Sequence, residues 1–185
     1  HGVKSHPPVV PEGQAQIAVP MLHDGQEYDK AEAGYRDVLR MASQGVVDEV
    51  GAVAATAMAG LANLLRFAER FGEAEELYGT ALAAREAMYG PVHASVAAIL
   101  ENLGLLYERT DRAEEAISTY ERALTIRDTV GGDFNRASSD VLMRLSRAFS
   151  AIDRYADAER VLRRLATMRE TLDGKNAPSL AEVYR

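Results

Sequence analysis

Residues 103–124 read LGLLYERTDRAEEAISTYERAL, a pattern that indicates how the chain folds. Large apolar and aromatic side chains recur at helical spacing, with small residues between them at Gly104, Ala116 and Ala123. Glycine inside a helix costs about 1 kcal/mol relative to alanine. That cost is offset where two helices pack closely, because small residues let the axes approach and large neighbours fill the flanking space. The stretch therefore predicts two antiparallel helices joined near residues 110–112.

The same pattern recurs along the chain at a fixed step, which we call the repeat step. Residues that lie one repeat step apart and are alike form what we call a column. The columns are Leu61/Leu103/Leu145, Ala74/Ala116/Ala158, Tyr78/Tyr120/Leu162, Arg85/Arg127/Arg169 and Gly90/Gly132/Gly174. A fixed period of this size is typical of stacked helix pairs. We expect such pairs over roughly 49–68/73–88, 93–109/113–130 and 137–151/155–172, and a weaker copy upstream, one residue out of step.

Local signals predict how these helices begin and end. Gly90 and Gly132 are expected to end the second helix of their repeats, and Pro91 to open the next helix. Asp111 is expected to cap the following helix, with acidic residues near its positive N-terminal end. The glycines therefore read as turn and packing residues, with no phosphate-binding spacing.

The domain layout follows from the same pattern. Residues 1–11 are proline-rich and read as a disordered lead, and residues 12–180 as one solenoid with repeats at about 12–48, 49–90, 93–132 and 137–174. Pro20 is expected to shorten or kink the first helix, because a proline inside a helix costs about 3 kcal/mol. Residues 177–185 read as the start of a further helix or cap, so we expect the natural protein to continue.

Composition limits the function. The chain has 185 residues, 47% of them hydrophobic and 26% charged, which is typical of a soluble folded protein. A net charge of −7 disfavours nucleic acid as a partner. No apolar run is long enough to insert into a membrane. The absence of cysteine leaves the compartment open: a cytoplasmic location is favoured, and export after signal removal is the alternative.

The columns around the opening stretch resemble a known family. The residues that carry the resemblance match the tetratricopeptide repeat signature in order and spacing; they are Leu103, Gly104, Tyr107, Ala116, Tyr120 and Ala123. The repeat unit is longer than the usual tetratricopeptide repeat. With its segments "ERALTIRDTVGGD" and "GTALAAREAMYGPVH" it resembles the kinesin-light-chain type of this repeat. This resemblance covers residues 55–180 well and 15–50 loosely. It implies an all-α, right-handed α-solenoid of about three to four antiparallel helix pairs, with the first helices lining a concave face.

The concave face is the expected binding surface. The candidate contact residues are Asn63, Arg66, Glu101, Asn102, Arg109, Arg144 and Arg147, and Glu108 lies among the wider set of residues expected on that face. A carboxamide such as that of Asn102 can both donate to and accept from an extended peptide backbone. Guanidinium groups pair with carboxylates, so we expect an acidic segment or a C-terminal carboxylate as ligand. The alternative that these are simply solvated helix positions stays open.

The predicted function is a scaffold that binds a peptide or protein partner. A self-assembling, homo-oligomeric module is the alternative, suggested by the apolar stretch VGAVAATAMAGLANLL over residues 50–65. We expect no enzyme activity, no metal and no cofactor, because the histidines, His1, His6, His23 and His93, lack metal-ligand spacing. Tyr78 and Tyr120 are expected in the core. The column Arg85, Arg127 and Arg169 is expected to pair with acids across repeats.

Overall fold

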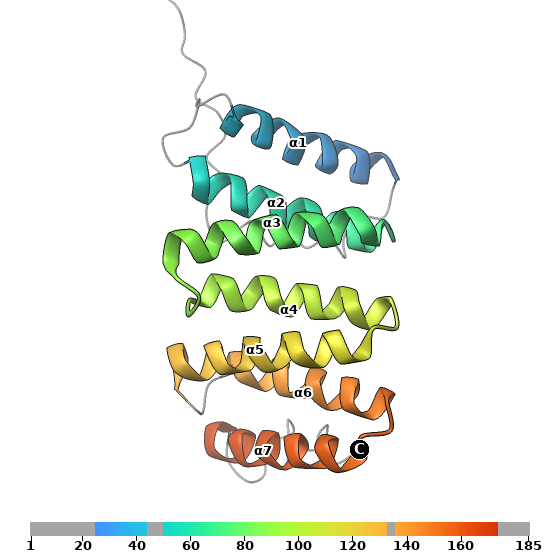
Figure 1. Cartoon of the computed structure of the whole chain (residues 1–185), viewed down its shortest axis with the longest axis vertical. Coiled ribbons are helices and arrows are strands. Elements are labelled where there is room, and N and C mark those ends of the chain that lie inside the picture. Colours follow the sequence, from blue (N-terminus) through green and yellow to red (C-terminus); the bar gives the residue numbers. More distant parts are fainter. Residues whose placement is uncertain (1–24, 44–49, 133–135, 174–185) are drawn as a thin grey trace, which may run out of the picture. The chain divides into compact units, whose positions relative to one another are not determined.

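The computed structural model describes residues 25–43, 50–132 and 136–173 (Figure 1). These residues form seven helices and no strand. The helices are α1 (Gly25–Ser43), α2 (Val50–Phe67), α3 (Phe71–Tyr89), α4 (Ala94–Arg109), α5 (Ala113–Gly131), α6 (Arg136–Ala151) and α7 (Tyr155–Asp173). The expectations for residues 1–11, Pro20 and residues 177–185 lie outside the described residues.

The helix bounds confirm the pairs expected from the repeat. Each of the helices α2 to α7 begins and ends within two residues of its predicted position. The weaker upstream copy supplies α1, which carries Tyr35. We refer below to α2, α4 and α6 as the first helices of their repeats, and to α1, α3, α5 and α7 as the second helices.

The chain divides into two compact units, and the boundary falls inside α3 between Leu77 and Tyr78. In the first unit α1 packs against α2. In the second unit α5 packs against both α4 and α6, and α6 packs against α7. Figure 1 shows α4 to α7 following one another in chain order.

Close packing of a glycine against a tyrosine confirms the reason for the small residues. A Cβ atom placed on Gly104 of α4 would lie 2.4 Å from Cε1 of Tyr120 on α5. Tyr120, Ala116 and Ala123 are fully buried, so the tyrosine ring occupies the space that the glycine leaves. The first unit has a similar close contact between α1 and the first helix of the next repeat, α2, since a Cβ atom on Gly60 would lie 2.5 Å from Cε1 of Tyr35.

The turns between paired helices share one backbone conformation. Glu69, Asp111 and Asp153 are separated by one repeat step each, and all three have φ near 60°. The next residue closes each turn by donating its N–H to a carbonyl five positions back, as Arg112 does to Tyr107 at 2.9 Å. The turn is therefore the same structure in three successive repeats.

This turn corrects the expected helix cap. The N-cap of α5 is Arg112, which makes no side-chain cap hydrogen bond, and not Asp111. Asp111 instead takes the left-handed conformation, which aspartate tolerates better than most residues. The expected acids do lie in the first turn of α5, at Glu114 and Glu115.

The loops between repeats mostly follow the prediction. Gly90 and Gly132 have φ of 80° and 77° directly after α3 and α5, which confirms both as helix-ending glycines. The helix α4 starts at Ala94 and is capped by His93, whose Nδ1 accepts the Ser95 N–H at 3.2 Å. Pro91 therefore lies in the loop before the cap, and the prediction that it opens the helix is wrong.

Candidate functional site

Four polar side chains meet in the second unit where α4, α5 and α6 come together. Glu108 lies in the last turn of α4, Tyr120 lies in the first half of α5, and Arg144 and Arg147 lie one turn apart on α6. Electrostatic interactions link Glu108 to all three of the others. We call these four residues the Glu108 cluster. It is assembled because α5 packs between the two first helices.

Burial dominates the electrostatics of the Glu108 cluster. It raises the pKa of Glu108 above its usual range, and the Tyr120 hydroxyl and the charges of Arg144 and Arg147 offset only part of this rise. Burial, with the nearby Glu108 charge, also raises the pKa of Tyr120, which therefore stays neutral at physiological pH. The carboxyl of Glu108 is consequently easier to protonate than a free one.

Two buried oxygen atoms of the cluster lack hydrogen-bond partners. Among the described residues, neither Oε1 of Glu108 nor the hydroxyl of Tyr120 has a partner. The Tyr120 hydroxyl approaches both the Glu108 carboxylate and the Arg144 guanidinium, but no hydrogen bond of good geometry results. An unsatisfied buried polar group costs about 1–3 kcal/mol, so such a pair calls for a functional explanation.

The first unit has an unsatisfied polar group at the same repeat position. Arg66 precedes Glu108 by one repeat step, and its Nε is buried without a partner among the described residues. Its guanidinium carbon lies 4.4 Å from the centroid of the Phe67 ring. The repeat position therefore holds a half-buried charged side chain in both units, a cation in one and an anion in the other.

The other predicted site residues have varied surroundings. Asn102 is half-buried, and its Nδ2 donates to the Ala98 carbonyl at 3.1 Å within α4. Glu101 accepts a hydrogen bond from Nε of Arg127 on α5 at 2.7 Å, so its carboxylate is already engaged by its own repeat. Arg109 is exposed, and Asn63 of the first unit is half-buried.

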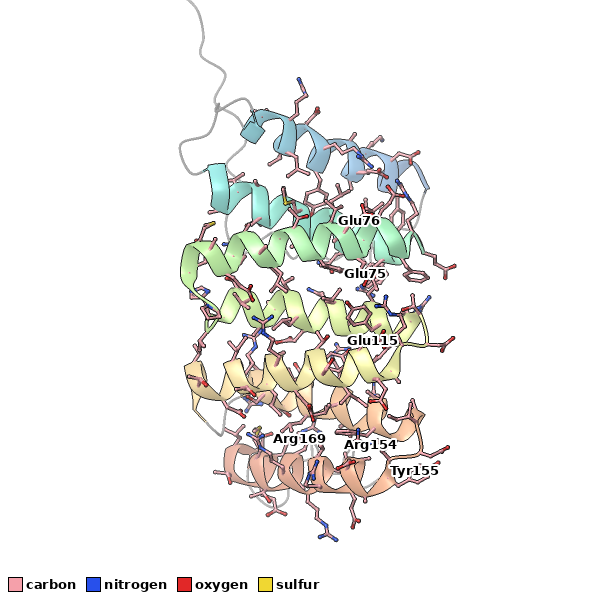
Figure 2. The ribbon with its side chains drawn as sticks, in the orientation of Figure 1. Glu75, Glu76, Glu115, Arg154, Tyr155 and Arg169 are labelled. Atoms are coloured by element: carbon pink, nitrogen blue, oxygen red, sulfur yellow. The ribbon has the colours of Figure 1, made fainter. Side chains whose placement is uncertain are left out.

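The recurring arginine column makes contacts within its own repeats, which differs from the expected pairing with acids across repeats. Arg127 pairs with Glu101, and Arg169 is buried on α7 with its Nε donating to Oγ of Ser139 on α6 at 3.2 Å. Figure 2 shows Arg169 in the space between these two helices. Arg85 places its guanidinium over the ring of Tyr89 in its own helix, 5.5 Å from the centroid.

A different column makes ion pairs across repeats. Arg122 on α5 pairs with Glu86 on α3, and Arg164 on α7 pairs with Asp128 on α5 at 2.6 Å. Arg164 follows Arg122 by one repeat step, and Asp128 follows Glu86 by the same step. We did not predict this column from the sequence, although its members are related by the repeat step.

Other kinds of site receive no support from the described residues. No group of three or more metal-ligating side chains comes together in the described ranges. Across the same ranges, no helix combines the length and apolarity required to cross a membrane. His93 caps a helix and stacks on Tyr89, with ring centroids 4.5 Å apart, so its role is structural.

Family models match most of the repeat region. Two models, both described as tetratricopeptide repeat, match residues 54–95 and 95–171. The chain belongs to the tetratricopeptide repeat family. This membership confirms the predicted family and, together with the helix pairs described above, the all-α helical repeat fold.

Solved structures with the same fold are repeat proteins of the kinesin-light-chain kind. BtubC (BKLC) of P. vanneervenii is similar with a TM-score of 0.77 and 21% sequence identity, over 93% of this chain and 71% of that one. A Podosopora anserina protein with nearly identical TPR-like repeats is described as a putative kinesin light chain. It is similar with a TM-score of 0.76 and 19% sequence identity, over 93% of this chain and 84% of that one. A search of curated proteins found no match.

Proposed function

We propose that this tetratricopeptide repeat chain is a protein-interaction scaffold that holds an acidic segment of a partner against Arg144 and Arg147. Tetratricopeptide repeats are in general protein–protein interaction modules, and the matched residues include this part of the chain. The acidic ligand and the two arginines that contact it are the specific content of the proposal.

One observation carries it: Arg144 and Arg147 are exceptions among the arginines of α6, α7 and the turn between these helices. The other arginines on and between α6 and α7 each have a direct side-chain partner; they are Arg136, Arg154, Arg160, Arg163, Arg164 and Arg169. Arg144 and Arg147 form no direct ion pair within the described part of the chain, and both interact electrostatically with the carboxylate of Glu108. Arg147 is exposed and Arg144 half-buried. Two cations on one helix face are thus available to a partner.

The neighbouring first helix offers a complementary contact. Asn102 on α4 uses its N–H group within the helix, and the remaining amide capacity suits the backbone of an extended segment. We leave Glu101 out of the proposed contact set, because Arg127 occupies its carboxylate. The segment would then be recognised in two ways. Arg144 and Arg147 of α6 would bind its acidic side chains, and Asn102 of α4 would bind its backbone.

A selected peptide tests this proposal. Peptides are selected from a phage-displayed random library on the full chain, and their binding is titrated by calorimetry. Replacing Arg144 and Arg147 by glutamine, together with Asn102→Ala, is expected to weaken binding about 10- to 100-fold through the loss of charge-assisted contacts.

The matched control is Arg160→Gln with Arg163→Gln, which removes the same charge from exposed positions on the second helix α7. It is expected to change affinity by less than about two-fold, since exposed ion pairs contribute little. Equal losses in the two variants, or no loss in either, would refute the proposed contacts. Unchanged far-ultraviolet circular dichroism verifies that the variants are folded.

Burial of the apolar side chains of α2 removes one reason to expect self-association. The apolar stretch over residues 50–65 belongs to α2, where Leu61, Leu64 and Leu65 are buried. These side chains serve the core and are not presented to a second copy. Light scattering over a wide concentration range tests the alternative directly, because a mass that stays monomeric contradicts it.

A further inference from the structure

We propose that Glu108 determines the specificity of the site, by shielding Arg144 and Arg147 so that its ionised carboxylate opposes the binding of acidic segments. This inference rests on the proposed function, since it concerns the same two arginines. It assigns Glu108 a role distinct from that of a ligand contact.

The position of Glu108 supports this role. Its carboxylate interacts electrostatically with both arginines, and Oε1 is buried with no hydrogen-bond partner in the described residues. Tyr120 faces it from α5 and is neutral, so within the described ranges Arg144 and Arg147 on α6 are the charges that balance it. Asp140, one turn before Arg144 on α6, is exposed and screened by solvent. Solvent screens a half-buried charge less than an exposed one, so Glu108 influences an approaching anion more than Asp140 does.

A purely structural role explains Glu108 less well. A carboxylate placed to stabilise the fold forms direct ion pairs, as Asp128 does with Arg164 at 2.6 Å and Glu101 with Arg127 at 2.7 Å. Glu108 forms none in the described residues, and a half-buried carboxylate without a hydrogen bond to Oε1 destabilises the folded state. Departures from the rules of stable packing concentrate at functional sites.

Protonation of Glu108 would then strengthen binding. Burial raises the pKa of Glu108, so the carboxyl takes up a proton at a higher pH than an exposed glutamate does. A neutral Glu108 leaves the charges of Arg144 and Arg147 unopposed. An acidic segment that is still ionised therefore binds more tightly as the pH falls toward the pKa of Glu108.

The test uses a fluorescein-labelled tetraglutamate peptide and the full chain, with binding followed by fluorescence anisotropy near pH 7. Glu108→Gln is expected to bind the peptide about 3- to 30-fold more tightly than the unmodified chain, the range that Coulomb's law gives for removing one nearby charge. The control Glu121→Gln makes the same charge change at an exposed position on α5 and is expected to alter affinity by less than about two-fold.

The outcomes separate this inference from the proposed function. Equal binding by Glu108→Gln and the unmodified chain, with loss of binding in Arg144→Gln/Arg147→Gln, overturns the inference and leaves the proposed function standing. Weaker binding by Glu108→Gln also overturns it, because Glu108 would then be a contact. Failure of every variant to bind the peptide overturns the acidic-ligand function and the inference with it.

Thermal unfolding gives a readout that needs no ligand. A raised carboxyl pKa means that the folded state binds the proton more tightly than the unfolded state, so the ionised group destabilises the fold above that pKa. Glu108→Gln is therefore expected to raise the melting temperature near pH 7, and the difference should shrink as the pH falls through the pKa of Glu108. A lower melting temperature near pH 7 would show a stabilising carboxylate and would overturn the inference.

Discussion

Replacing Tyr120 by alanine is expected to reduce the free energy of unfolding by about 3–5 kcal/mol, as for other large buried side chains. Tyr120 is fully buried, and its ring fills the space over Gly104 between α4 and α5. Truncation leaves a cavity that a rigid helix pair cannot close. The measurement is urea unfolding followed by circular dichroism.

Tyr155 provides the control for this experiment. It is 64% exposed at the start of α7, where Figure 2 shows its side chain at the edge of the helix. Tyr155→Ala removes the same atoms and is expected to cost less than about 1 kcal/mol. Similar losses in the two variants would mean that Tyr120 does not fill the contact between these helices.

Adding one methyl group at each of two helical glycines is expected to have opposite effects. Gly104→Ala should destabilise the protein by about 1–3 kcal/mol, because the new Cβ atom collides with the Tyr120 ring 2.4 Å away. Gly79→Ala should stabilise it by up to about 1 kcal/mol, because a Cβ atom on Gly79 in α3 meets nothing within 4 Å and alanine favours the helix.

A double variant then tests the cause of the difference. In a Tyr120→Ala background the collision is gone, so Gly104→Ala should lose its penalty and show only the gain in helix propensity. Additive effects of the two substitutions would indicate that Gly104 and Tyr120 act independently, against the packing described here. The measurement is again urea unfolding, with all four members of the cycle compared under the same conditions.

Much of the fold could be predicted because the repeat makes each column visible several times. The repeat step located the helices, the glycines that end them and the small residues that accommodate tyrosines. The prediction for Asp111 is wrong because aspartate suits both a helix cap and a left-handed turn. Only the backbone conformation distinguishes these two roles.

The candidate site was predicted less completely. Arg144 and Arg147 could be selected from helical spacing, since one helix carries both. The environment of Glu108 depends on three helices at once, and no local pattern reports burial, an unsatisfied oxygen or the approach of Tyr120. The position of Glu101 on α4 made it a candidate contact residue. Its carboxylate pairs with Arg127 of α5, and the sequence pattern of α4 does not report this pairing.

If a partner segment binds as proposed, it contacts the guanidinium groups of Arg144 and Arg147, and arginine side-chain NMR detects such contacts. The full chain, labelled with ¹⁵N in its arginines, is titrated with a peptide selected on it, and the Nε–Hε signals are followed. We expect the signals of Arg144 and Arg147 to shift in proportion to peptide bound, while those of Arg160 and Arg163 on α7 stay in place. Saturating peptide that shifts the α7 signals and leaves those of Arg144 and Arg147 unchanged would contradict the account.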